Sequence, residues 1–343
     1  MIDVTMLCIY DWANTGWRFA QCLKMLGLNV FAFKGAYHPF GYPEQIPIHP
    51  DLVDTERSFE DGAKCALFAD VNSAFLAGIC KDSKVIHFRD TCLINTGVDL
   101  EEKKVVAQHG GRLYRSAHDY WNNNFGYLID KTIIQMPDIL GHGAPGEALV
   151  YYPVQTDHPM LRPDFERANN GVVAFGHFPT TQIEKGSDMF FNALNRHWNE
   201  GRRGFLYGGP TEFEETKSWI TVWPFHLERL KQVDVVLETC CMVAQGKPFG
   251  EWGNQCIEAA SMGKIVITNT LSAELYRKEY GDGFAPRIAN NDDDIYRHIG
   301  EILEMSDSEL RAEKQKHRAW VEKYHSMEAT AERLWERIYK DLI

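Results

Sequence analysis

The sequence has no run of about 18 apolar residues, the length that a membrane-spanning helix needs. Its first residues, MIDVTMLCIYDW, contain no basic stretch followed by an apolar stretch and a small-residue cleavage site, so they do not resemble a signal peptide. We therefore expect a cytoplasmic protein without a transmembrane segment.

The sequence also lacks the usual signatures of a metal site. It has eight cysteines but no CxxC pair, no HExxH motif and no cluster of cysteine and histidine at ligand spacing. Most of the cysteines lie in apolar runs such as MLCIY and LETCCMV, which favours buried thiols over disulfides. We expect no metal ion.

Basic residues are scarce relative to acidic ones. Lysine and arginine number 36 against 48 aspartates and glutamates, and the formal charge is −12. Broad affinity for nucleic acid requires many phosphate contacts from basic side chains, so this charge argues against it, although a local basic groove remains compatible.

The length of 343 residues suits two domains, each with its own core.

The N-terminal half begins with the pattern of a βαβ unit. Residues 5 to 13 predict a buried strand, residues 17 to 26 a helix and residues 29 to 33 a second strand. The intervening loop lies at the carboxyl edge of the expected parallel sheet, where open α/β proteins bind ligands. It is not GxGxxG, so it carries no dinucleotide fingerprint. Either a tight turn or a ligand contact explains its three residues, Asn14, Thr15 and Gly16.

His109 follows the predicted strand at 104 to 108, which places an imidazole at the same edge of the sheet. It is a candidate substrate contact, and a structural histidine is the alternative. Residues 37 to 50 contain four prolines and predict a long loop, while residues 120 to 127 are rich in aromatic and amide side chains that suit sugar hydroxyls and ring faces.

Polar residues and prolines cluster between residues 155 and 170, which predicts the domain boundary there. We expect an N-terminal domain over 1–165 and a second α/β domain over 166–320. From Ser306 onward, apolar residues recur every three or four positions up to Leu342, which predicts one long helix with a single apolar stripe. The end of this helix, residues 321–343, is the last of three segments into which we divide the sequence, after the two domains.

The stretch KPFGEWGNQCIEAASMGKIVITN, residues 247 to 269, predicts a glycine loop, a helix, a glycine stop and a buried strand. A loop that leads into a helix N-terminus presents unpaired amides and the positive end of the helix dipole. Gly250 and Gly253 therefore indicate an anion site, and an ordinary βαβ turn is the alternative. The earlier loop after GVVAF, with Gly176 and His177, is expected at the same edge of the second sheet.

Two segments resemble the family 4 glycosyltransferases, which have the GT-B fold of two facing Rossmann-like domains with a nucleotide-sugar cleft. VVAFGHFPTTQIEKGSDMFFNAL is similar to that family's strand, loop, Lys-Gly and helix, with Lys185 and Gly186 at the matching positions and His177 where an arginine is usual. GNQCIEAASMGKIVITN resembles its apolar run, Glu-Ala, glycine and strand. A weaker likeness lies in YYPVQTD. The resemblance implies that residues 1–165 bind the acceptor, residues 166–320 bind the donor, and the C-terminal helix packs back on the first domain.

The resemblance also implies roles for individual residues. Lys185 and the amides near Gly253 would hold the donor's phosphates, and Glu258 would accept hydrogen bonds from the ribose. The family has two glutamates separated by seven residues, but that spacing from Glu258 leads to Gly250, so Glu251 next to it would have to contact the sugar. The donor-binding residues would be Asn14, Thr15, Gly16, Gly176, His177, Lys185, Gly250, Glu251, Trp252, Gly253, Asn254 and Glu258, and the catalytic ones Glu251, His109 and Lys185.

The activity that the resemblance implies is transfer of a hexose or pentose from a UDP- or GDP-sugar to an acceptor hydroxyl, with retained anomeric configuration and no metal. The donor would be a substrate, with no further cofactor. The acceptor would be a glycan, a small molecule or a modified DNA base. Three alternatives remain open: a phage-type DNA-base glycosyltransferase, a nucleotide-sugar epimerase of the same fold, and a protein that binds a nucleotide sugar without catalysis.

Overall fold

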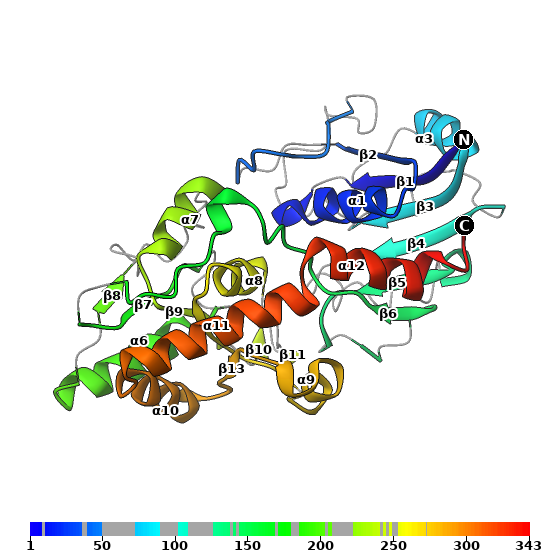
Figure 1. Ribbon diagram of the computed structural model, residues 1–343. Coiled ribbons are helices and arrows are strands. Elements are labelled where there is room, and N and C mark those ends of the chain that lie inside the picture. Colours follow the sequence, from blue (N-terminus) through cyan, green and yellow to red (C-terminus); the bar gives the residue numbers. More distant parts are fainter. Residues whose placement is uncertain are drawn as a thin grey trace, which may run out of the picture. The chain divides into compact units, whose positions relative to one another are not determined.

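The computed structural model describes residues 1–8, 11–35, 40–49, 73–89, 102–108, 126–137, 140–141, 144–168, 171–179, 185–202, 205–207, 222–240, 243–244, 247–248, 253–271 and 273–343. The chain divides into two compact units (Figure 1). The N-terminal unit comprises Met1–Pro153 together with Met327–Ile343, and the C-terminal unit comprises Val154–Ser326. Within the described ranges, no helix has the length and apolar character needed to cross a bilayer.

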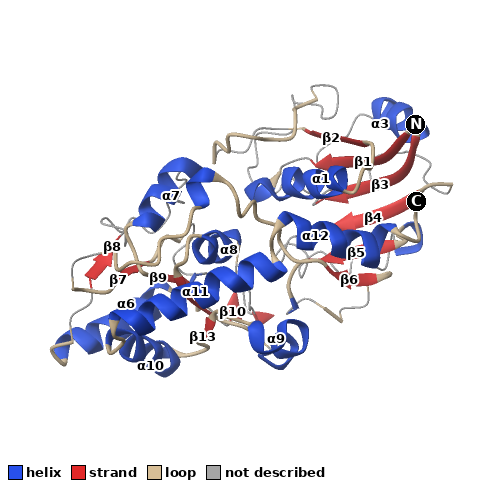
Figure 2. Cartoon of the chain, viewed as in Figure 1, coloured by secondary structure: helices blue, strands red, loops and turns tan. Residues whose placement is uncertain are grey.

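The N-terminal unit is built on one parallel sheet, seen as red arrows in Figure 2. Its described strands lie in the order β2-β1-β3-β4-β5-β6, and every neighbouring pair is parallel. They are β1 (Ile2–Cys8), β2 (Val30–Lys34), β3 (Ser83–Arg89), β4 (Lys104–Gln108), β5 (Lys131–Ile134) and β6 (Glu147–Leu149). The helices α1 (Thr15–Met25) and α3 (Ser73–Lys81) connect strands of this sheet. The run KCALF at residues 64 to 68, whose apolar residues predict a further strand, lies outside the described residues.

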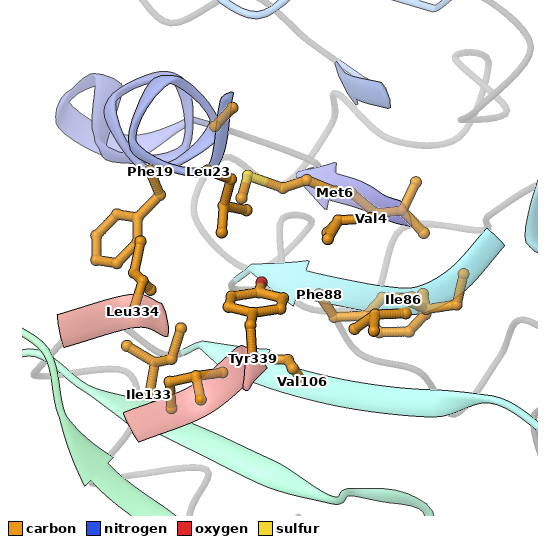
Figure 3. Packing of buried hydrophobic residues seen from close by; sticks show 14 of the residues in the cluster. Val4, Met6, Phe19, Leu23, Ile86, Phe88, Val106, Ile133, Leu334 and Tyr339 are labelled. Atoms are coloured by element: carbon orange, nitrogen blue, oxygen red, sulfur yellow. The ribbon is translucent and has the colours of Figure 1, made fainter. Parts of the chain in front are cut away.

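The core of the N-terminal unit joins segments that are far apart in the sequence. Phe19 and Leu23 on α1 are fully buried and pack with strand residues such as Met6. Leu334 and Tyr339, near the C-terminal end of the sequence, belong to the same cluster (Figure 3). Residues 327–343 therefore complete this core, as the spacing of their apolar residues allows.

The C-terminal unit repeats the architecture with a second parallel sheet, whose described strands lie in the order β13-β12-β9-β7-β8. Its strands are β7 (Ala174–Gly176), β8 (Phe205–Tyr207), β9 (Val235–Thr239), β12 (Ile265–Thr268) and β13 (Arg287–Ile288), and β10 (Val243–Ala244) pairs antiparallel with β11 (Lys247–Pro248). Its helices are α6 (Ser187–Asn199), α7 (Trp223–Lys231), α8 (Asn254–Ser261), α9 (Ala273–Tyr280), α10 (Asp292–Leu303) and α11 (Asp307–Tyr324). Two parallel sheets flanked by helices confirm the predicted α/β fold.

The predicted single C-terminal helix is divided in the structure. α11 ends at Tyr324, α12 (Met327–Leu334) follows, and a π-helical turn covers Trp335–Tyr339. The interruption is fixed by tertiary contacts, because the Val154 amide donates to the His325 carbonyl at 2.7 Å and Val154 forms a β-bridge with Ser326. α11 thus belongs to the C-terminal unit and α12 to the N-terminal unit.

The polar segment from 155 to 170 packs on the C-terminal unit. The Asp164 amide donates to the Met262 carbonyl at 3.1 Å, and the Ala168 amide donates to Asp234 Oδ1 at 2.8 Å. Asp234 is fully buried and paired with Lys314, whose Nζ lies 2.7 Å from its Oδ1. These contacts hold the segment on the C-terminal unit, which begins at Val154. Assignment of the units to acceptor and donor stays a prediction.

Candidate donor site

The strand order reverses between β7 and β9 in the C-terminal sheet, because β8 lies on one side of β7 and β9 on the other. Such a switch point is where open α/β sheets bind ligands, at the carboxyl ends of the strands. β7 ends at Gly176 and β9 ends at Thr239. A ligand site is therefore expected where these two strands end.

At this edge, Lys185 and the N-terminus of α8 meet on one carboxylate. Lys185 Nζ donates to Glu238 Oε1 at 2.8 Å and to Thr239 Oγ1 at 2.8 Å. The Gly253 amide, at the N-cap of α8, donates to the same Glu238 Oε1 at 3.2 Å. The Thr239 hydroxyl donates to the other carboxylate oxygen, Glu238 Oε2. A cation and a helix N-terminal amide thus converge on one anionic oxygen. The same two kinds of hydrogen-bond donor bind phosphate oxygens in proteins.

Glu238 was not among the residues that the sequence analysis selected. Its carboxylate is only 2% exposed, whereas the Lys185 side chain is 20% exposed. A signal for it exists, because Glu238 is a carboxylate within the largely apolar run VVLETCCMV, and a buried charge needs a partner. Its pairing with a lysine 53 positions earlier depends on the strand order and is not visible in the local sequence.

His177 has a structural role in this conformation. Its ring is fully buried, with Nδ1 2.6 Å from the Leu237 carbonyl oxygen and Nε2 2.7 Å from Ser187 Oγ. Burial lowers the pKa of this imidazole to about 4, so the ring is neutral at pH 7. Both nitrogens are occupied by protein partners, and the side chain connects β9 to the start of α6 without offering a charge to a phosphate.

Gly176 is required by packing. A Cβ at this position would lie 2.6 Å from two atoms of the Phe178 ring and 2.8 Å from Val233 Cγ1. The absence of a side chain therefore allows Phe178 to fold back over the end of β7. Gly176 is also a predicted donor-binding residue, and its packing against Phe178 is an independent reason for glycine there.

Glu258 lies within α8 and is 2% exposed. Its Oε1 accepts a hydrogen bond from the Trp223 indole Nε1 at 3.0 Å, at the start of α7. The Trp223 ring also packs edge-on against His158, with centroids 5.4 Å apart. Asn254 is the first residue of α8, directly after the N-cap Gly253. The predicted residues Lys185, Gly253, Asn254 and Glu258 thus gather around the N-terminal half of one helix.

In the N-terminal unit, a carboxylate also holds a helix N-terminus. Asp11 accepts from the Gly16 amide at 2.6 Å and from the Trp17 amide at 2.9 Å, and Arg89 Nη1 lies 3.4 Å from its Oδ1. Asn14 has a left-handed backbone, with φ of 57°, and its Nδ2 donates to the Glu44 carbonyl at 2.8 Å. Thr15 is buried, and so is Asp11, which was not among the predicted site residues.

A row of polar residues crosses the same edge. Lys34, Cys8, Arg89 and Gln108 are successive partners on β2, β1, β3 and β4, and all four are buried. The carboxamides of Gln108 and of Gln135, just after β5, are fully buried, and neither makes a hydrogen bond with any part of the chain that the structure describes. Unpaired buried amides are costly and are concentrated at functional places in native proteins.

The predicted residues His109, Gly250, Glu251 and Trp252 lie outside the described residues. Among those that are described, no group of three or more His, Cys, Asp or Glu side chains could hold a metal ion. The three neighbouring aspartates 292 to 294 form the first turn of α10, where Asn291 caps the helix and negative charge is favourable.

Comparison with known proteins identifies the fold. No family model matches the sequence, and no curated protein matches it. Among solved structures, the chain is similar to a glycosyltransferase from Rickettsia africae, with a TM-score of 0.60 and 13% identity over 99% of this chain and 98% of the other. It is similar to sucrose-phosphate synthase from Thermosynechococcus elongatus, with a TM-score of 0.63 and 10% identity over 100% and 99%.

A third neighbour is an alpha-glucosyltransferase bound to UDP and a 13-mer DNA containing an HMU base, with a TM-score of 0.63 and 10% identity over 98% of this chain and 99% of the other. These three solved structures are glycosyltransferases, and the chain shares the GT-B fold with them. At these identities the likeness shows the fold alone, and the predicted GT-B fold is confirmed.

Proposed function

We propose that this protein is a glycosyltransferase, related to family 4, that moves a sugar from a nucleotide-sugar donor to an acceptor hydroxyl. The observation that supports it best is the convergence of Lys185 Nζ and the Gly253 amide on one oxygen, at 2.8 Å and 3.2 Å. In the proposed complex, a donor phosphate oxygen would accept from Lys185 Nζ and the Gly253 amide, as Glu238 Oε1 does in this conformation. The switch point of a GT-B C-terminal unit is a suitable position for such a site.

The chemistry of the reaction needs these groups. When the sugar leaves its donor, negative charge accumulates on the diphosphate, and preorganised donors stabilise that charge in the transition state. Lys185 supplies a full positive charge, and the N-terminus of α8 supplies amides and the positive end of its dipole. Retention of configuration and independence of metal ions are inferred from the likeness of the motifs to family 4.

Glu258 is the proposed ligand of the ribose hydroxyls. It is two turns or less from Gly253 along α8, and Trp223 Nε1 fixes one of its oxygens at 3.0 Å. Because the side chain is 2% exposed, a ribose that binds it must replace part of its present surroundings. Glu258→Gln keeps the shape and weakens the acceptor, so we expect weaker binding of UDP with little change in binding of inorganic pyrophosphate.

Calorimetric titration with UDP, GDP and ADP tests the site directly. We expect one nucleoside diphosphate to bind the wild-type protein, and Lys185→Ala to weaken that binding about tenfold, because a charge-assisted hydrogen bond is lost. Lys231→Ala is the matched control, since Lys231 lies on α7 with a half-exposed side chain paired to Glu228. If the wild type and Lys185→Ala bind the nucleoside diphosphate equally well, the donor site does not include Lys185.

Glu251 and His109 are the proposed catalytic residues besides Lys185. We expect Glu251→Gln and His109→Ala to lower the rate of transfer from the preferred nucleotide sugar roughly 100-fold, as removal of a catalytic group does. Both variants should bind UDP about as tightly as the wild type does, in contrast to Lys185→Ala. Normal turnover of either variant would exclude that residue from the chemistry.

Transfer to a modified DNA base is the second candidate function. It is favoured by the structural neighbour that was solved with UDP and a DNA containing an HMU base. Its test is binding of a duplex with hydroxymethylated bases at low and moderate salt, because phosphate contacts make DNA affinity strongly salt-dependent. Salt-sensitive binding together with sugar transfer would support it, and no binding at low salt would exclude it.

A further inference from the structure

We propose that Glu238 is an internal anion that competes with the donor's phosphates for Lys185 and the N-terminus of α8, and so sets the affinity of the site. This inference rests on the proposed donor site and adds its regulation. The contacts that carry it are already present in the protein: Lys185 Nζ at 2.8 Å and the Gly253 amide at 3.2 Å both donate to Glu238 Oε1.

Thr239 completes the arrangement. Its hydroxyl accepts from Lys185 Nζ at 2.8 Å and donates to Glu238 Oε2, so each of the three side chains contacts the other two. The carboxylate is 2% exposed, which strengthens its interaction with the lysine relative to an exposed pair. The lysine that faces the site therefore has its positive charge matched by a neighbouring carboxylate before any ligand arrives.

A diphosphate that binds here meets one cation and one anion. If the carboxylate kept its place, the phosphate oxygens would lie beside a like charge in a poorly solvated position, and that repulsion would weaken binding. If the phosphate takes the place of Glu238 Oε1, Lys185 and the Gly253 amide exchange one anionic oxygen for another. In both cases, the negative charge of Glu238 lowers the affinity of the site for the donor.

A purely structural role for Glu238 predicts the opposite sign. A carboxylate that only holds Lys185 in position would help the donor, and its removal would leave the lysine less ordered and lower the affinity. Competition predicts that removal of the charge raises the affinity. The sign of one measured change therefore separates the two roles.

The experiment compares Glu238→Gln with the wild type by calorimetric titration of UDP and, separately, of inorganic pyrophosphate. Glutamine keeps the shape and the hydrogen-bond acceptor but has no charge. We expect both ligands to bind about tenfold more tightly, which corresponds to about 1.4 kcal/mol. Glu228→Gln is the control, because it changes the net charge equally at an exposed position on α7 and should leave both affinities unchanged.

Thr239→Val is the second variant, because it removes the hydroxyl that contacts Lys185 and Glu238 without changing the charge. It tests the competition even if Glu238→Gln folds poorly. We expect a smaller gain in affinity for both ligands. Unchanged or weaker binding of UDP by the variants, with normal binding by the wild type, would overturn the competition and leave the donor site intact. Tighter binding of pyrophosphate with no binding of any nucleotide would support the competition and overturn the proposed function. No binding of either ligand to any form would overturn both.

Discussion

The Tyr339 hydroxyl lies 2.7 Å from Nδ1 of His87, which joins the π-helical turn after α12 to the middle of strand β3 across 252 positions of sequence. Both side chains are fully buried. Leu334 and Ile338 bury their side chains in the same core, and Arg337 Nη1 donates to the Leu149 carbonyl at 2.8 Å. The last turns of the sequence are therefore integral to the N-terminal unit.

Substitution of Tyr339 should destabilise the N-terminal unit, and the loss should be larger when the ring is removed than when only the hydroxyl is removed. We expect Tyr339→Phe to lower the free energy of unfolding by about 1 kcal/mol, because only the hydrogen bond to His87 is lost. Tyr339→Ala should cost about 3 to 5 kcal/mol, because the buried ring is lost as well. Urea unfolding followed by circular dichroism measures both. Equal stability of the two variants would contradict this packing.

Stability of the C-terminal unit should decrease between pH 6.5 and pH 4. Burial lowers the pKa of His177 and of His317 to about 4, below the ordinary value of 6.5. In that window the unfolded chain binds more protons than the folded one, so the free energy of unfolding falls as the pH falls and is fully retained above pH 6.5. Each histidine contributes about 3 kcal/mol over the window.

The measurement is the free energy of unfolding at pH 7.5, 6, 5 and 4.5 for the wild type and for His317→Leu. Leucine cannot titrate, and it replaces a ring whose Nδ1 lies near the Glu313 carbonyl oxygen of its own helix. We expect a smaller loss of stability in the variant than in the wild type. A pH profile that is identical for the two proteins would contradict the assignment of His317 to this effect.

Gly176→Ala should destabilise the C-terminal unit by about 1 to 3 kcal/mol, the usual cost of an overpacked core. The added methyl group would lie 2.6 Å from atoms of the Phe178 ring, so the ring must move away from the end of β7. Gly78→Ala on α3 is the matched control. Nothing lies within 4 Å of its Cβ position, and alanine is favoured over glycine inside a helix by about 0.5 to 1 kcal/mol. Thermal unfolding of both variants gives the comparison.

Gln108→Met should raise the free energy of unfolding by about 1 to 2 kcal/mol, because an unpaired buried carboxamide is replaced by an apolar side chain of similar shape. The Gln108 amide makes no hydrogen bond with the described residues, so the substitution breaks none with that part of the chain. Chemical denaturation tests this. A destabilised variant would mean that the amide is paired in solution. A stabilised variant that loses transferase activity would show that the position is kept for a substrate.

The sequence predicts those parts of the molecule that local patterns determine. Strand β4 was predicted at its observed bounds, because KVVAQ is an apolar run between polar segments. The single C-terminal helix was wrong, since the apolar spacing continues unchanged across His325 and Ser326. The interruption depends on hydrogen bonding to Val154, which is 172 positions from Ser326 and leaves no local trace.

The candidate site shows the same division. Lys185 and Gly253 could be selected from short stretches of sequence, because Lys185 belongs to a Lys-Gly pair that resembles a family 4 motif and Gly253 precedes a predicted helix. Glu238 and Asp11 were not selected, because their charged partners, Lys185 and Arg89, lie far from them in the sequence. His177 was selected for its motif position, and only its two hydrogen bonds reveal that its ring serves the protein interior.

The chain enters the C-terminal unit at Val154 and leaves it at Ser326, so this unit is one uninterrupted stretch placed within the sequence of the other. During synthesis the C-terminal unit is complete once Ser326 has left the ribosome. The N-terminal unit still lacks Leu334 and Tyr339 at that moment and cannot close its core. The half of the protein that is translated first is therefore the half that finishes folding last.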